Sequence, residues 1–185
     1  MDMTDLTTRD RLITTAAMLF RQKGYHGTGL SEVLDAARVP KGSLYHHFPQ
    51  GKADLARAAA DWTAVEIMKI MDASFDPAAD FVSGATTLFH KVAKLFDLTQ
   101  AANACPISAL LFDGPESDDF RAHAAAVFAR LTAHIATHAT RLGLPDAEAQ
   151  AQAETLLITL EGGWTLARAH RNSDLLRRVP GRLYG

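Results

Sequence analysis

Apolar residues recur every three or four positions along most of this chain, which is the spacing of one face of an α-helix. Glycine, proline and capping residues interrupt the pattern and divide it into separate segments. The predicted helices span residues 8–23, 30–37, 40–48, 52–71, 79–98, 107–112, 117–142, 145–171 and 174–179. The sequence has neither alternating β-branched runs nor hairpin turns between apolar runs, which are the usual signals of strands. It therefore predicts an all-α fold of about nine helices.

The first three predicted helices are arranged as a helix-turn-helix unit. Residues 30–37 carry an apolar stripe that ends at Arg38-Val39-Pro40, and a second helix of two turns follows at once. Two short helices joined by a tight turn, the second with a polar face, are typical of DNA-binding proteins. Such short helices are not stable alone. We therefore expect the helix over residues 8–23, closed by Gly24, to complete their core.

The second helix of this pair has a polar surface. Leu44 and Phe48 lie four residues apart and share its apolar face. Its other positions carry hydrogen-bond donors and one aromatic ring: Lys41, Ser43, Tyr45 and His46. Phosphate oxygens and base edges of DNA accept hydrogen bonds from such groups. Lys52 begins the next helix, where a cation is unfavourable unless an anion lies nearby, and this also indicates a phosphate.

Composition is that of a soluble globular protein. The 185 residues are 48% hydrophobic and 22% charged, which are ordinary values for a folded domain. The polar N-terminus is unlike a signal peptide, and charges interrupt every apolar run before the ~18 residues that a bilayer requires. The single Cys105 excludes an internal disulfide. We therefore expect a protein of the reducing cytoplasm that has no membrane partner.

Charge is unevenly distributed along the chain. The net charge is −2 overall, yet residues 1–57 hold eight Lys and Arg against six Asp and Glu, a net charge of +2. The remaining residues hold eleven basic and fifteen acidic side chains, a net charge of −4. A mildly basic N-terminal part beside an acidic remainder fits a DNA-binding domain attached to a domain that avoids DNA.

The N-terminal part contains a characteristic set of residues: Gly24-Tyr25, Thr28, the run P-K-G-S-L-Y-H-H-F from Pro40 to Phe48, and Lys52. This set resembles the TetR family of bacterial transcriptional regulators. The segment between Phe48 and Lys52 is one residue longer than usual, and Arg38 stands where the family usually has glycine. This longer segment, together with C-P-I-S-A-L and E-G-G-W further along, is similar to the branch of the lincomycin-resistance repressor.

This resemblance implies a homodimer that binds a palindromic DNA operator and releases it when a small hydrophobic inducer occupies a cavity. By position, Lys41, Ser43 and His46 would face bases, and Gly42 would allow the helix backbone to approach the DNA closely. The residues implied to contact phosphates are Thr28, Tyr45, His47 and Lys52. We accordingly predict a DNA-binding domain over residues 1–53 and a domain for ligand binding and dimerisation over residues 54–185. An alternative for Tyr45 and His47 is that they only hold this N-terminal domain together.

Large apolar residues of the C-terminal part are candidates for a ligand cavity. Aromatic and methionine side chains adapt to varied apolar ligands. The candidates are Trp62, Met68, Phe89, Phe96, Phe112, Phe128 and Trp164. Residues at helical spacing also form ordinary core, so each of them has this alternative.

Small residues on one helix face are candidates for the dimer interface. Small side chains let helices pack closely, as a two-fold four-helix contact requires. The candidates are Ala149, Ala153, Leu157, Leu160 and Gly163. The alternative is that this face packs against a neighbouring helix of the same chain.

No catalytic or metal-binding motif emerges from the sequence. His134 and His138 share a helix face at a spacing that metals can use, but no His-Glu-x-x-His frame or second cluster accompanies them. We interpret them as surface or core polar residues. The Gly-x-Ser-x-Gly turn of a hydrolase is also absent. We therefore expect neither an enzyme nor a bound cofactor or metal.

The sequence is thus interpreted as a ligand-responsive repressor. Three other functions remain open: an activator, a ligand-independent regulator with the same DNA-binding domain, and a small-molecule-binding protein or enzyme whose DNA-binding domain is vestigial.

Overall fold

The computed structural model describes residues 6–99 and 118–185, and this part of the chain contains eight α-helices and no strand. The all-α prediction is therefore confirmed, with a helix number close to the expected nine. The predicted helix over residues 107–112, together with Cys105 and Phe112, lies outside the described residues. Two compact units divide the chain: unit 1 is Met1–Val65 and Pro106–Val127, and unit 2 is Glu66–Cys105 and Phe128–Gly185.

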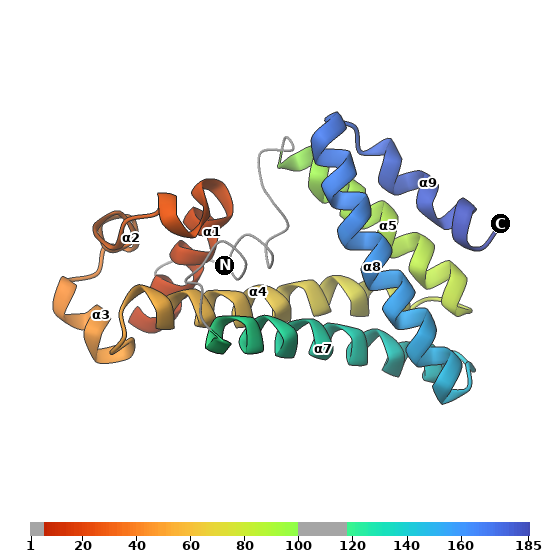
Figure 1. The fold of residues 1–185 in the computed structure, drawn as a ribbon, viewed down its shortest axis with the longest axis horizontal. Coiled ribbons are helices and arrows are strands. Elements are labelled where there is room, and N and C mark those ends of the chain that lie inside the picture. The colour runs from red at the N-terminus through yellow and green to blue at the C-terminus, as the bar shows by residue number, and fades with distance from the viewer. Residues whose placement is uncertain (1–5, 100–117) are drawn as a thin grey trace. The chain divides into compact units, whose positions relative to one another are not determined.

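Unit 1 is built on three helices, α1 (Thr8–Gly27), α2 (Leu30–Ala37) and α3 (Lys41–His47), which pack on one another (Figure 1). The side chain of Thr7 accepts a hydrogen bond from the backbone N–H of Asp10 and caps α1, which satisfies one of the free donors at a helix start. Gly24 leaves the helical path with φ +72°, so the predicted stop at this glycine is a kink. Leu12 and Leu44, which have no exposed surface, contribute to the core.

Two long helices, α4 (Lys52–Phe75) and α7 (Asp118–Arg141), pass from unit 1 into unit 2. In unit 1, the Tyr25 ring stacks on Phe20 with centroids 5.7 Å apart and meets the edge of Phe120 from α7 at 6.0 Å. Leu55 of α4 is fully buried in the same unit. The starts of both long helices therefore contribute to the core of unit 1.

Unit 2 adds α5 (Phe81–Leu98), α8 (Asp146–His170) and α9 (Asp174–Leu183), and α9 packs against both α5 and α8 (Figure 1). Arg177 of α9 donates to the Asp97 carboxylate of α5 at 2.7 Å. Hydrogen bonds from Ser173 and then from Arg177 hold the pKa of Asp97 below its usual value. Helix α9 was expected to end at Val179 but continues through the buried Pro180, because a proline near a helix end removes only one backbone hydrogen bond.

Arg38 has a left-handed backbone at the turn between α2 and α3, with φ 55° and ψ 49°. Its N–H donates to the carbonyls of Leu34 and Asp35, which ends α2. The left-handed conformation costs a residue with a side chain about 1–2 kcal/mol, and glycine avoids this cost. Arg38 therefore adopts the geometry that a glycine would provide at lower free energy.

Substitution of Arg38 by glycine is expected to raise the free energy of unfolding by about 0.5–1 kcal/mol, because the relief of left-handed strain exceeds the entropy that glycine adds to the unfolded chain. Urea unfolding at fixed protein concentration measures this difference. Arg178→Gly is the matched control. Arg178 is exposed in the interior of α9, where glycine is expected to cost about 1 kcal/mol. Loss of stability in both variants would contradict the strain at Arg38.

Candidate nucleic-acid interface

Helix α3 separates a buried face from an exposed polar face. Leu44 is fully buried and Phe48, directly after the helix, is 2% exposed. Tyr45 is 48% exposed, and Lys41, Gly42 and His46 are exposed as well. Ser43 and His47 are half-buried. The structure thus brings six of the predicted DNA-contacting residues together on one short helix.

Gly42 has no neighbour in the folded chain that requires its small size. A Cβ atom added there would meet nothing within 4 Å. Glycine in a helix costs about 1 kcal/mol relative to alanine, so the local fold gains nothing from it. The position therefore leaves room for close approach of another molecule to the α3 backbone, and the role of Gly42 in DNA binding stays a prediction.

The turn after α3 contains the additional residue seen in the sequence. Gly51 has φ +66°, and its N–H donates to the Phe48 carbonyl at 2.8 Å. A Cβ atom on Gly51 would come within 3.5 Å of the Tyr45 ring. The longer turn therefore lies against the exposed tyrosine and supports its ring.

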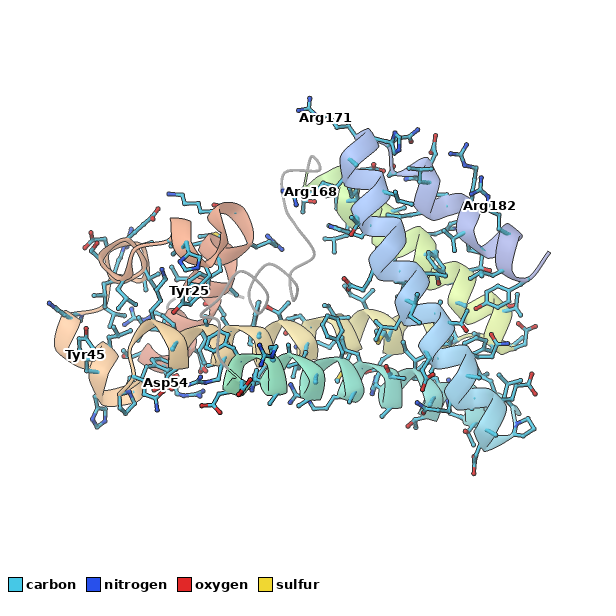
Figure 2. All side chains as sticks on the ribbon, in the orientation of Figure 1. Tyr25, Tyr45, Asp54, Arg168, Arg171 and Arg182 are labelled. Atoms are coloured by element: carbon cyan, nitrogen blue, oxygen red, sulfur yellow. The ribbon has the colours of Figure 1, made fainter. Side chains whose placement is uncertain are left out.

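A polar network joins this turn to the start of α4. The Asp54 carboxylate accepts from the Gln50 N–H at 2.8 Å and from the Arg57 guanidinium at 2.8 Å. Arg57 also donates to the Gln50 side chain at 2.9 Å. Figure 2 labels Asp54 and Tyr45, which lie on either side of this turn in the sequence. Sequence reasoning missed Gln50, Asp54 and Arg57, although the spacing of three residues places Asp54 and Arg57 on the same face of α4.

Lys52 contacts an aromatic ring in the free protein. Its Nζ lies 4.4 Å from the centroid of the Tyr25 ring, a cation–π distance. Partial burial lowers the pKa of Lys52. Burial also raises the pKa of Tyr25, against the opposing charge of Arg57. The ammonium group thus already has a partner in the free protein, and the phosphate contact implied for Lys52 stays a prediction.

Thr28 is placed differently from the other predicted DNA-contacting residues. Its side chain is 1% exposed, and its hydroxyl donates to the Gly24 carbonyl at 2.9 Å. The phosphate contact implied for Thr28 requires this side chain to become accessible, and it stays a prediction.

The residues predicted for the ligand cavity are distributed over both units. Trp62 is in unit 1 and is 39% exposed. In unit 2, Phe96 and Trp164 meet edge to face with centroids 5.3 Å apart, and both are buried, as is Phe89. Met68 and Phe128 are half-buried. The structure thus brings Phe96 and Trp164 together, and the role of the set in ligand binding stays a prediction.

The small-residue face of α8 is covered by the chain itself. Ala149, Ala153, Leu157 and Leu160 are at most 9% exposed, and a Cβ atom on Gly163 would lie 2.9 Å from Leu176 of α9. Intramolecular neighbours cover much of this face, which favours the alternative that it packs within the same chain, and the assignment of these five residues to a dimer interface stays a prediction. Other apolar residues of α8 are exposed: Ile158 at 70% and Leu166 at 55%.

No helix among the described residues is long and apolar enough to cross a membrane.

Two family models match the chain. Residues 12–59 match the model of bacterial regulatory proteins of the tetR family. Residues 82–181 match the model described as the C-terminal domain of LmrA/YxaF-like transcriptional regulators. Both are families of regulators rather than enzymes, which confirms the prediction that the chain is not an enzyme.

Relatives and solved structures agree with these matches. The chain is 30% identical to an uncharacterized HTH-type transcriptional regulator, YxaF of Bacillus subtilis, over 91% of this chain and 88% of the relative. It superposes on a regulatory protein TetR from Rhodobacter sphaeroides with a TM-score of 0.77 and 28% identity, over 94% and 96% of the two chains. A structure of the TetR family regulator CifR with double-strand operator DNA shares the fold, with a TM-score of 0.75 and 21% identity over 94% and 93%.

Proposed function

Because this chain belongs to the TetR family of DNA-binding transcriptional regulators, with an LmrA/YxaF-like C-terminal domain, we propose that it is a repressor that a small hydrophobic inducer releases from its operator. In this proposal it binds a palindromic operator as a homodimer. Residues 1–53 bind the DNA, and residues 54–185 carry the inducer site and the dimer contact.

The observation that carries this proposal is the exposed polar face of α3. Lys41 and His46 are exposed donors suited to guanine acceptors in the major groove, while the buried Leu44 anchors the helix from behind. Tyr45, supported by the turn at Gly51, has a rigid phenol suited to a phosphate oxygen. The net charge of +2 over residues 1–57 favours DNA further.

Helix α4 offers a route from the inducer to the DNA contact. It is one continuous helix from Lys52 to Phe75, and the Asp54–Arg57 network joins its first turn to the turn after α3. An inducer that binds better to a shifted α4 would displace α3 with it. Paired recognition helices must lie one DNA turn apart, about 34–36 Å, so a small shift would remove contacts in both half-sites.

Fluorescence anisotropy with the DNA upstream of the gene tests this proposal. The full chain is titrated on that DNA and on unrelated DNA of equal length, with and without candidate hydrophobic compounds. Tight binding to the upstream DNA that one compound weakens at constant salt is the expected result. Equal affinity for the two DNAs would contradict operator binding, and reporter expression that falls after deletion of the gene would identify an activator instead.

The proposed dimer contact is the exposed stripe of Ile158, Gly162 and Leu166 on α8. These residues are spaced four apart and so share one helix face, and a Cβ atom on Gly162 would meet nothing within 4 Å. The two exposed apolar side chains and the glycine between them allow a second helix to pack closely on this face, as the helices of a two-fold dimer do.

Replacement of Ile158 by glutamate is expected to weaken the dimer at least about 100-fold, because a two-fold interface buries the new charge twice and a buried apolar contact of this kind contributes ~2 kcal/mol or more. Sedimentation velocity over a range of protein concentrations measures the change. Val82→Glu on α5, which alters a residue that is 44% exposed, is the matched control. Dimers that persist equally in both variants would place the contact elsewhere.

A further inference from the structure

Three side chains that the sequence separates widely meet in unit 2. Asp72 lies near the end of α4, and His134 and His138 lie one turn apart on α7. The Asp72 Oδ1 is 2.6 Å from His134 Nε2 and 2.9 Å from His138 Nε2. One ligand atom from each of the three residues lies within 4.8 Å of the other two. Two imidazole nitrogens and one carboxylate oxygen therefore converge on one point.

One member of the cluster, His138, is buried and packed against a neighbour, whereas Asp72 and His134 are partly exposed to solvent. The His138 side chain is 8% exposed, and its ring stacks on Phe75 with centroids 5.2 Å apart. The side chains of Asp72 and His134 are 42% and 29% exposed. An ion could therefore reach the cluster from solvent, while His138 presents Nε2 from a fixed position.

We propose that Asp72, His134 and His138 bind a divalent first-row transition metal ion, with Zn²⁺ the best match, and that water completes its coordination. Imidazole nitrogen is a preferred ligand of Zn²⁺, Cu²⁺, Ni²⁺ and Fe²⁺, whereas Mg²⁺ and Ca²⁺ prefer oxygen ligands alone. Three protein ligands and an open position form a common zinc arrangement. Neither the family matches nor the proposed regulatory function requires this site.

The distances allow the ion with a small adjustment. Zinc binds imidazole nitrogen at about 2.0–2.1 Å and carboxylate oxygen at about 2.0–2.2 Å, so tetrahedral ligand atoms lie about 3.4 Å apart. The present separations from Asp72 Oδ1 are 2.6 and 2.9 Å, which are hydrogen-bond distances. A displacement of the half-exposed Asp72 carboxylate by less than about 1 Å lengthens these two separations. The two imidazole nitrogens lie within 4.8 Å of each other, and rotation of the half-buried His134 side chain adjusts that separation.

Protonation of the three groups is compatible with metal binding. Partial burial raises the pKa of Asp72, but hydrogen bonds from His138 and His134 outweigh this effect, and the pKa lies below its usual value. The carboxylate is therefore ionised at neutral pH. In the metal-free protein each imidazole donates a hydrogen bond from Nε2–H to Asp72. Metal binding therefore requires each neutral histidine to carry its proton on Nδ1 instead, which leaves the Nε2 lone pair for the ion.

Two side chains near His138 Nδ1 bear on whether this nitrogen can carry the proton. The Asp76 carboxylate lies 3.7 Å from His138 Nδ1, beyond hydrogen-bond distance. A small shift would let it accept a hydrogen bond from Nδ1–H, as carboxylates do for zinc-bound histidines. The Arg141 guanidinium is 3.3 Å from the same nitrogen and also donates to the Phe75 carbonyl at 2.9 Å. In the metal-bound state Arg141 keeps the Phe75 contact and releases the nitrogen.

Titration of the full chain with Zn²⁺ tests the proposal. The protein carries no histidine tag and is freed of metal with a chelator; binding is followed by calorimetry, and Co²⁺ absorption reports imidazole coordination. We expect one ion per chain and a thermal midpoint that rises with Zn²⁺ concentration. His134→Gln and His138→Gln are each expected to weaken binding at least about 100-fold, a larger loss than the 10- to 100-fold typical of residues that only support ligands.

Matched variants separate this site from other histidines. His90→Gln, which alters an exposed histidine on α5, is expected to bind Zn²⁺ like the parent chain. The adjacent pair on α3 is tested by the double variant His46→Gln, His47→Gln, which is also expected to retain binding. Far-UV circular dichroism checks that each variant is folded. Binding that persists in folded His134→Gln and Asp72→Asn, or that disappears with the α3 pair, would overturn the proposal and leave the cluster as a metal-free hydrogen-bonded contact between α4 and α7.

Discussion

Replacement of Lys41 by alanine is expected to lower the affinity for the operator at least about 10-fold and to change the affinity for unrelated DNA much less. Lys41 is exposed at the start of α3, where the proposed interface directs it to base edges. A side chain that reads one base contributes about 1–3 kcal/mol to discrimination. Anisotropy titrations on operator variants with single base changes would show the lost preference at particular positions.

Replacement of Lys52 by alanine is expected to act on every DNA alike. A phosphate contact releases a counterion whatever the sequence, so the slope of log affinity against log salt concentration should become shallower by about one for each subunit. The free-state contact of Lys52 with the Tyr25 ring lowers the net gain from this phosphate contact.

A lysine outside unit 1 controls for charge alone. Lys94→Ala removes an exposed lysine of α5 in unit 2 and should leave both the affinity and the salt slope nearly unchanged. If Lys41→Ala and Lys52→Ala reduced binding to operator and unrelated DNA by equal factors, the proposed division between base and phosphate contacts would be wrong.

The sequence predicted the surface of α3 because local spacing determines it. Leu44 and Phe48 share one face of a two-turn helix, so their burial exposes Lys41 and Tyr45. The boundary between α2 and α3 follows for the same reason, since Pro40 acts on the backbone within one turn of itself. Gly24 acts locally as well, but it produces a kink inside α1 rather than the predicted end. The all-α fold needed only the period of the apolar pattern.

Contacts between distant helices were beyond the sequence. The spacing of His134 and His138 was visible, but nothing in the chain marks Asp72, which is 62 residues from His134, as their partner. Likewise, the stripe of Ala149 and Ala153 predicts a buried face without showing what covers it. Periodicity identifies a face that packs, whereas the identity of the neighbour depends on how the whole chain folds.

Replacement of Gly84 by alanine is expected to lower the free energy of unfolding by about 2 kcal/mol, although alanine is the better helix former. A Cβ atom on Gly84 would lie 2.2 Å from Cδ1 of Phe75. Phe75 is fully buried and stacks on both Phe81 and His138, so its ring has little room to move. Overpacking of a rigid core site costs about 1–3 kcal/mol, and the Phe75 ring is also the support of the His138 side chain.

Gly181→Ala provides the opposite outcome for the same chemical change. Gly181 lies in the last turn of α9, and its added Cβ atom would meet nothing within 4 Å, so alanine is expected to stabilise the chain by up to about 1 kcal/mol. Urea unfolding of both variants measures the two changes in the free energy of unfolding, which are expected to have opposite signs.

The double variant Gly84→Ala, Phe75→Leu should lose less stability than the two single changes combined, because the smaller side chain makes room for the new methyl group. If the losses of stability were additive, a clash between the new methyl group and Phe75 would not explain the destabilisation by Gly84→Ala. Such a clash predicts that the smaller side chain at position 75 reduces the cost of the alanine.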